Sequence, residues 1–233
     1  MPKELTYAIG DVHGCYTQVR NLLRHCRDHC GENRFRMVFL GDFIDRGRRS
    51  REVVALLMEM QASDRERIVC LRGNHEEMAL TAAQGEDAAI WLVNGGDATL
   101  RSYGVGQARD MPPEHLDWMA ALPLALRDER RFFVHAGVEP GVPLEAQDKQ
   151  SLLWIREPFL SDPRDHGRYI VHGHTPTERP ELLPNRLNID TGACFGGPLT
   201  AAVFDQRGKG PLAFITNDGT VVRAPPLTEL VEP

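Results

Sequence analysis

Cysteine and long apolar segments are scarce in this sequence, and positive charge is not in excess. Its five cysteines are an odd, scattered set, which excludes a regular disulfide framework and fits a reducing compartment. The formal net charge of -6 gives no basic field that would favour nucleic acid. No apolar run approaches the roughly 20 residues needed to span a bilayer, and Met1–Gly10 lacks the pattern of a signal peptide. We therefore expect a cytoplasmic protein that binds neither nucleic acid nor membrane.

Length and composition favour one globular domain. Hydrophobic residues make up 42% of the 233 residues and charged residues 26%, which is ordinary for a soluble protein. A chain of this size can bury about 70% of the surface that it exposes when unfolded. The sequence shows no internal repeat, low-complexity segment or linker, so we expect a single domain over residues 1–233. Its acidic balance still permits a phosphorylated substrate, because bound metal ions can reverse the local charge.

The first third of the chain alternates short apolar runs with helical patterns. The runs Leu5–Ile9, Phe35–Leu40 and Arg67–Leu71 have the length and residue types of strands. Between them, apolar residues at helical spacing over 19–30 and 53–60 predict two amphipathic helices. This alternation predicts right-handed βαβ units with a mainly parallel sheet. The polar motifs that follow the runs would then meet at the carboxyl edge of the sheet, where ligands bind.

The remainder of the chain predicts further helices and a second sheet. Ala88–Val93 and Glu114–Leu122 have helical patterns, with Gly95-Gly96 as a loop between them. Strand signals return at Arg131–Val134 and Arg168–Val171. We expect the last four short strands to be antiparallel additions that complete a second sheet: Leu187–Ile189, Thr200–Phe204, Leu212–Thr216 and Thr220–Val222.

Six polar side chains follow predicted strand ends and together suit a metal site. Carboxylates, imidazoles and an amide oxygen form the ligand mixture preferred by borderline ions such as manganese, iron or zinc. The set is too large for one tetrahedral site, but two ions about 3.5–4 Å apart that share a carboxylate would use it fully. Such a pair can lower the pKa of bound water to roughly 7 and so supply hydroxide. The six residues are Asp11, His13, Asp42, Asn74, His135 and His174.

Five short motifs contain these residues in order along the chain. They are Gly10-Asp11-Val12-His13-Gly14, Gly41-Asp42-Phe43-Ile44-Asp45-Arg46-Gly47, Gly73-Asn74-His75-Glu76, His135-Ala136-Gly137 and Gly173-His174-Thr175. This series resembles the phosphoprotein phosphatase branch of the calcineurin-like metallophosphoesterases, closest to the bacterial and bacteriophage-lambda-type serine/threonine phosphatases. The resemblance implies an α/β fold in which two mixed β-sheets are sandwiched between helices, in four αββα layers.

The resemblance also implies how the metal ligands are divided. Asp11 and His13 would bind the first ion, and Asp42 would bridge both. The second ion would be bound by Asn74, His135 and His174. Two divalent ions are therefore expected, with manganese as the first choice and iron or zinc as alternatives.

The same resemblance assigns the remaining site residues. His75 would be the general acid that protonates the leaving oxygen, oriented by Asp45, while Arg46 and Arg156 would hold the phosphate. Guanidinium groups match phosphate oxygens in a bidentate way, and a general acid contributes about 10²–10⁴-fold. The expected reaction is hydrolysis of protein phosphoserine or phosphothreonine by a hydroxide that bridges the metals, with phosphoprotein, phosphopeptide or small phosphomonoesters as substrates.

Two other functions compete with this interpretation. A symmetrical dinucleoside-tetraphosphate hydrolase shares the first motif, but that branch usually lacks the aspartate found here as Asp45. It also carries His-Trp-Ala where this chain has His174-Thr175-Pro176. The other alternative is a binding protein that has kept the fold and lost activity, although none of the expected ligands is missing.

Several single residues also have alternative interpretations. His172 lies two residues before His174 and could replace it as a ligand, while His75 could be structural or could bind metal in place of Asn74. Asp45 and Arg46 could simply pair at a turn. On the first predicted helix, the i, i+4 spacings His25–His29 and Cys26–Cys30 could hold zinc, but buried free cysteines are common on an apolar helix face.

Overall fold

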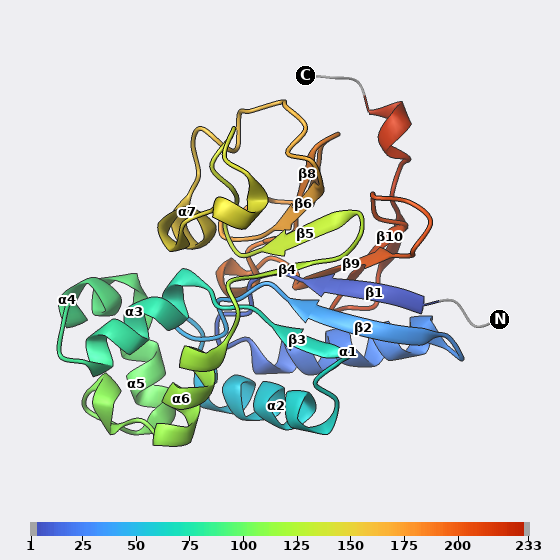
Figure 1. The fold of residues 1–233 in the computed structure, drawn as a ribbon. Helices are drawn as coiled ribbons and strands as arrows, with labels where there is room; N and C mark the ends of the chain where they lie inside the picture. Colours follow the sequence, from blue (N-terminus) through green and yellow to red (C-terminus); the bar gives the residue numbers. More distant parts are fainter. Residues whose placement is uncertain (1–3, 231–233) are drawn as a thin grey trace.

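The protein, described here over residues 4–230 by a computed structural model, contains two β-sheets that pack face to face (Figure 1). The larger sheet has six strands in the order β11-β10-β9-β1-β2-β3, and the smaller has five in the order β4-β5-β6-β8-β7. The larger sheet consists of β1 (Glu4–Ile9), β2 (Arg34–Phe39), β3 (Ile68–Cys70), β9 (Thr200–Phe204), β10 (Ala213–Thr216) and β11 (Val221–Arg223). The smaller consists of β4 (Ala125–Arg127), β5 (Arg131–Val134), β6 (Tyr169–His172), β7 (Glu181–Leu182) and β8 (Arg186–Asn188).

Both sheets are mixed, and their parallel strands are the ones that lead to the polar motifs. β1 runs parallel to β2, which runs parallel to β3. In the smaller sheet β6 runs parallel to both β5 and β8, while β4 and β7 are antiparallel edge strands. The carboxyl ends of β1, β2, β3, β5 and β6 therefore all carry loops toward one rim.

The last four strands follow the prediction only in part, because three of them are antiparallel as predicted but belong to the other sheet. β9, β10 and β11 extend the larger sheet, where β9 pairs antiparallel with β1 from Thr6–Phe204 to Ile9–Ala201. The strand predicted at Leu187–Ile189 does belong to the smaller sheet, but it pairs parallel with β6. The reason is that the chain leaves the smaller sheet after β8 and returns to the free edge of β1, which satisfies that strand's hydrogen bonds.

Helices cover the outer face of the larger sheet. α1 (Tyr16–Cys30) and α2 (Ser50–Ser63) lie against it and bury the apolar faces that the sequence predicts, for example Leu22 and Leu57 (Figure 1). Next to α2, a helical cap consists of α3 (Asn74–Ala83), α4 (Ala88–Trp91), α5 (Asp97–Tyr103) and α6 (Pro113–Ala121). Leu92–Gly96, which contains the predicted Gly95-Gly96 loop, instead forms a wide helical turn that joins α4 to α5, with a φ of 102° at Gly95.

A layer of apolar side chains joins the two sheets. It includes Val38 and Leu40 from the larger sheet and Phe133 and Val171 from the smaller one, all fully or almost fully buried. On the outer face of the smaller sheet lies α7 (Lys149–Trp154), followed by the segment that contains Phe159. The predicted fold of two mixed sheets between helices is confirmed, with a fourth layer that is thinner than the first.

The expectation of one domain over residues 1–233 stays a prediction. Within residues 4–230, none of the helices is long and apolar enough to cross a membrane.

Candidate metal centre

The structure brings all six predicted ligand side chains to one buried rim between the sheets. The strands β1, β2 and β3 lead to it from the larger sheet, and β5 and β6 from the smaller. Because these strands are short and end at the same level, Asp11 and His174 come into hydrogen-bond contact although they are 163 positions apart. The six side chains, each at most 7% exposed, are Asp11, His13, Asp42, Asn74, His135 and His174.

Three ligand atoms of this set converge on one point. The side-chain oxygen of Asn74 lies 2.8 Å from Nε2 of His135 and 3.0 Å from Nδ1 of His174. His135 Nε2 also lies 3.4 Å from a carboxylate oxygen of Asp42. Nδ1 of His135 donates to the carbonyl of Leu40 at 3.0 Å, so in the neutral ring Nε2 carries a lone pair. Lone pairs that face each other at this distance repel unless a cation lies between them.

His13 and Asp42 form the neighbouring half of the rim. Nδ1 of His13 donates to the carbonyl of Ile44 at 2.8 Å, which again directs the lone pair of Nε2 inward. That atom lies 3.4 Å from the second carboxylate oxygen of Asp42. Burial lowers the pKa of His13 to about 3, so the ring is neutral and able to bind metal. Asp42 therefore presents one oxygen to each half, as a bridging ligand must.

Asp11 is one of three carboxyl groups, with Asp42 and Asp190, that are buried together at the rim. Its two carboxylate oxygens accept the backbone N–H of His174, each at 3.2 Å. Burial, together with the charges of Asp190 and Asp42, raises the pKa of Asp11 well above its usual range. Burial likewise raises the pKa of Asp190 to about 6. Three carboxylates in one desolvated place need cations nearby, and the neutral imidazoles supply none. Arg46 provides a single positive charge, so the excess of carboxylates and the donor set fit divalent metal ions.

The backbone is strained at these positions. Among residues 4–230, five of the six non-glycine residues with positive φ belong to the predicted site. Such conformations cost on the order of 1–3 kcal/mol each and persist only where the surroundings impose them. The five are His13 (45°), Asp42 (53°), Asp45 (71°), Arg46 (64°) and His174 (66°).

His75 and Asp45 form a buried pair beside the ligands. Nδ1 of His75 lies 2.6 Å from a carboxylate oxygen of Asp45, and this carboxylate also accepts from Trp91 Nε1 and Thr99 Oγ1. Burial opposes a charge on His75, but Asp42 and Asp45 outweigh it and raise the pKa of the ring. Nε2 of His75 faces the rim, 3.8 Å from Asp42. The pair can therefore hold a proton and present it to the site.

The two predicted phosphate-binding arginines differ in their surroundings. Arg46 donates from Nη1 to His13 Nε2 at 2.7 Å and from Nη2 to His75 Nε2 at 3.0 Å. Its guanidinium also lies 5.3 Å from the centre of the Phe195 ring. Arg156 is exposed, but its positive charge is close enough to contribute to the lowered pKa of His174. Arg46 therefore touches the rim directly, whereas Arg156 acts on it through its charge.

The sequence matches the calcineurin-like phosphoesterase family over residues 6–209. The chain belongs to this family. It is 34% identical to the serine/threonine-protein phosphatase 1 of Salmonella typhimurium, over 84% of this chain and 90% of that protein. It is 38% identical to a symmetrical bis(5'-nucleosyl)-tetraphosphatase of Janthinobacterium, over 87% of this chain and 93% of that protein. The fold is similar to that of a cold-active protein tyrosine phosphatase, with a TM-score of 0.69, 19% identity and coverage of 96% and 80%.

One residue that supports the site of this phosphoesterase was not predicted from the sequence. Glu76 is fully buried, and its carboxylate accepts the backbone N–H groups of Asp42 at 2.9 Å, Phe43 at 2.7 Å and Gly73 at 2.9 Å. It therefore holds the loop after β2 against the start of α3. The sequence signal that could have identified it is the glutamate at the end of the motif Gly73-Asn74-His75-Glu76, which follows an apolar strand.

Of the alternative ligands, His75 lies at the rim in a group with His13 and Asp42 that could hold a metal ion, whereas the others lie elsewhere. His172 is buried against Phe159 and its Nε2 lies 3.3 Å from Arg186, so the side chain belongs to the outer layer of the smaller sheet. On α1, Cys26 and Cys30 are buried in the core. The groups of potential ligands found in residues 4–230 include neither these cysteines nor the histidines next to them.

Proposed function

We propose that this phosphoesterase hydrolyses phosphoserine and phosphothreonine in proteins, with two divalent metal ions, manganese foremost. When bound, the ions would neutralise the substrate phosphate and supply hydroxide from water near pH 7. The first ion would be held by Asp11 and His13, the second by Asn74, His135 and His174, and both by Asp42.

The arginines would bind and orient the phosphate. Arg46 would have to give up its bonds to Nε2 of His13 and Nε2 of His75. Metal binding by His13 needs the lone pair of its Nε2, and an acid role for His75 needs a proton on its Nε2. The guanidinium would then offer its donors to phosphate oxygens in a bidentate arrangement. Arg156, which is exposed and whose charge acts on His174, would complete the neutralisation of a dianionic phosphate.

The observation that carries the proposal is the His75–Asp45 pair. A serine alkoxide is a poor leaving group, so its hydrolysis needs a proton donor close to the departing oxygen. Asp45 fixes the proton on Nδ1 and favours the imidazolium, which leaves Nε2–H to protonate the leaving oxygen. The likeness to the Salmonella phosphatase, at 34% identity over most of both chains, supports the same reaction.

Hydrolysis of dinucleoside tetraphosphates is the second candidate function. The 38% identity to the Janthinobacterium tetraphosphatase favours it. Against it, a nucleotide is a better leaving group than serine and has less need of a buried acid with its own carboxylate.

A cytoplasmic location is also part of the proposal, supported by the five cysteines, all of them free.

The proposal can be tested with protein that has been stripped of metal by a chelator and reconstituted with manganese. Its kcat/KM would be measured on a phosphoserine peptide, diadenosine tetraphosphate and p-nitrophenyl phosphate. We expect kcat/KM to be highest on the peptide. His75→Asn should keep its metal content but lose about 10²–10⁴-fold in turnover of the peptide. On p-nitrophenyl phosphate, whose leaving group needs no proton, the loss should be much smaller. Asp42→Asn should lose both metal and turnover.

Two results would contradict these assignments separately. Equal turnover of the phosphoserine peptide by wild type and His75→Asn would exclude His75 as the acid. A higher kcat/KM on diadenosine tetraphosphate than on the peptide would instead favour the dinucleotide as substrate.

A further inference from the structure

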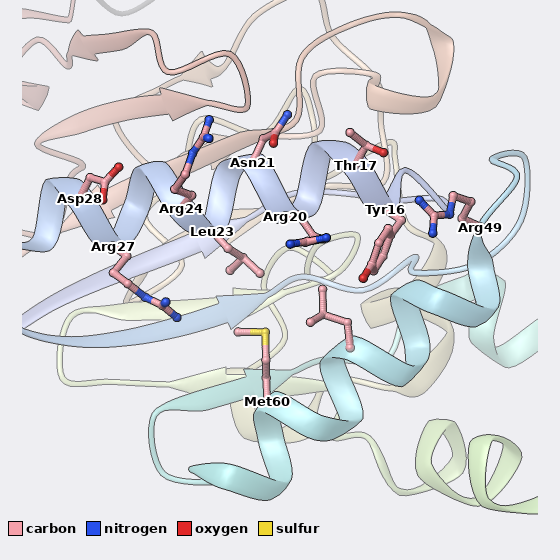
Figure 2. Close-up of a pocket in the computed structure, with 11 residues that line it drawn as sticks. Tyr16, Thr17, Arg20, Asn21, Leu23, Arg24, Arg27, Asp28, Arg49 and Met60 are labelled. Atoms are coloured by element: carbon pink, nitrogen blue, oxygen red, sulfur yellow. The ribbon is translucent and has the colours of Figure 1, made fainter.

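A basic groove lies between α1 and α2, on the outer side of the larger sheet (Figure 2). Its volume is about 710 Å³, and Asp28 is the one carboxylate among the described residues that line it. The protein as a whole has a net charge of -6, so this concentration of positive charge is local. Four arginines line the groove, namely Arg20, Arg24, Arg27 and Arg49.

The three arginines on α1 are not neutralised by a carboxylate among the described residues, although Nη2 of Arg24 lies 3.4 Å from Nε2 of His25. Arg20, Arg24 and Arg27 are exposed and follow one another at spacings of four and three residues, which places them along one side of the helix. Within residues 4–230, no carboxylate forms an ion pair with any of them. The fourth arginine of the groove differs, because Arg49 pairs with Glu52 at 2.8 Å.

The groove also has an apolar floor. Leu23 and Met60 point toward each other between the helices, beside Arg20 and Arg27 (Figure 2). At the other end, the ring of Tyr16 lies 5.9 Å from the guanidinium of Arg20 and 4.3 Å from that of Arg49. An apolar base rimmed by guanidinium groups, most of which have no carboxylate partner among the described residues, suits an extended peptide that carries acidic and apolar side chains.

One end of the groove is anchored to the loops of the metal centre. Tyr16 follows His13 by three residues, and Arg49 follows Arg46 by three residues. The two loops are joined where the backbone N–H of Arg49 donates to the carbonyl of Gly14 at 3.2 Å. A chain that leaves the catalytic rim on this side therefore enters the groove directly.

We propose that the α1–α2 groove binds an acidic segment of the phosphoprotein substrate, next to the phosphorylated residue. This inference rests on the proposed phosphatase function. Tyr16 and Arg27 are eleven residues apart on α1, which corresponds to about 17 Å at a helical rise of 1.5 Å per residue. An extended peptide covers this distance with about five residues, so the recognised segment has about that length.

A pair of phosphoserine peptides tests the groove, one with five flanking residues rich in glutamate and the other with glutamine in their place. For wild type, the KM of the acidic peptide should be about tenfold lower, with similar kcat. The triple variant Arg20→Gln/Arg24→Gln/Arg27→Gln should abolish this preference, since each surface pair contributes up to about 1 kcal/mol. Its turnover of p-nitrophenyl phosphate should not change.

The matched control is Arg109→Gln/Arg207→Gln/Arg223→Gln, which removes the same charge from exposed arginines outside the groove. This variant should keep the preference for the acidic peptide. High salt should weaken the preference in wild type, because it screens exposed charges.

A direct binding measurement tests the groove as a peptide-binding site independently of the proposed phosphatase activity. A fluorescent, unphosphorylated acidic peptide should bind wild type and the control variant, and bind the triple variant about tenfold more weakly. Equal binding to all three proteins would contradict the proposal that the groove binds the peptide. Displacement of the peptide by an RNA oligonucleotide that binds more tightly would also overturn it. Groove-dependent binding of the peptide without turnover of either phosphopeptide would support the groove and refute the phosphatase function.

Discussion

A single carboxylate, Glu76, holds two of the ligand loops in position. Oε2 accepts from the N–H groups of Asp42 and Gly73, and Oε1 accepts from that of Phe43. All the groups that face the carboxylate are donors, so an amide could not satisfy them in either orientation. Asp42, the proposed bridging ligand, is thus held in position by an acid that need not touch metal or substrate.

Glu76→Gln should therefore destabilise the protein and weaken metal binding. Its NH₂ group would face backbone donors whichever way the amide is turned, and a buried unsatisfied group costs about 1–3 kcal/mol. Urea unfolding of the metal-free proteins measures this loss. Glu77→Gln is the control, because Glu77 is partly exposed and pairs with Arg72 and Lys149, so we expect a loss below about 1 kcal/mol. Equal stability of Glu76→Gln and wild type would contradict this role.

Phe195 should position Arg46 without taking part in folding. The ring is 66% exposed and lies 5.3 Å from the guanidinium. An exposed cation–π contact contributes about 0.5–1 kcal/mol, so Phe195→Ala should raise KM for p-nitrophenyl phosphate about two- to fivefold. Phe195→Tyr should restore it, and the unfolding temperature should stay constant throughout. A KM that is the same for all three proteins would exclude the positioning role.

The loops after the strands pack so closely that glycine is required at their crossings. A Cβ at Gly47 would lie 2.0 Å from the carbonyl oxygen of His13, and one at Gly173 would lie 2.1 Å from a carboxylate oxygen of Asp11. No side chain fits at such distances. The motif glycines therefore set how near the strand ends approach one another, which in turn sets the spacing of the ligands.

Gly173→Ala should weaken metal binding because the new methyl group would displace Asp11. We expect the affinity for manganese to fall by at least about tenfold, the range typical when the support of a ligand is lost. Metal titration followed by calorimetry measures the change. Gly208→Ala is the control, since no atom lies within 4 Å of its added Cβ. Unchanged affinity in Gly173→Ala would show that Asp11 is not a ligand.

The sequence predicts local elements of this fold better than their long-range pairing. The runs that become β1, β2 and β5 and the apolar faces of α1 and α2 are local patterns, and each lies where it was predicted. β9 pairs with a strand almost 200 residues earlier, and no local pattern specifies that partner. β4 and β7, with three and two residues, are too short to give a periodic signal.

The same limit applies to the candidate site. Motif order identifies the side chains that meet at the rim, because parallel strands bring their carboxyl ends together. The contacts of Trp91 and Thr99 with Asp45 join residues 46 and 54 positions apart. Contacts of this kind depend on how the α3–α5 cap packs, which helical periodicity alone does not fix.

The candidate ligands come from both halves of the molecule, so metal should stabilise the packing of the two sheets. Asp11, His13, Asp42 and Asn74 follow strands of the larger sheet, whereas His135 and His174 follow strands of the smaller sheet. Without a cation, Asp11 and Asp42 repel Asp190, which follows β8 of the smaller sheet, across this boundary. Bound metal would act on the native state alone, because the unfolded chain does not hold the ligands together.

Manganese at about 100 times its dissociation constant should therefore add about 2.7 kcal/mol to the free energy of unfolding. For a chain of this size, that corresponds to a rise of about 5–10 °C in Tm. Differential scanning calorimetry of the chelated and reloaded protein measures the shift. Asp42→Asn should lose most of it, and Asp117→Asn, on the exposed side of α6, should keep it. If saturating manganese left the Tm of wild type unchanged, the rim between the sheets would not be a metal centre.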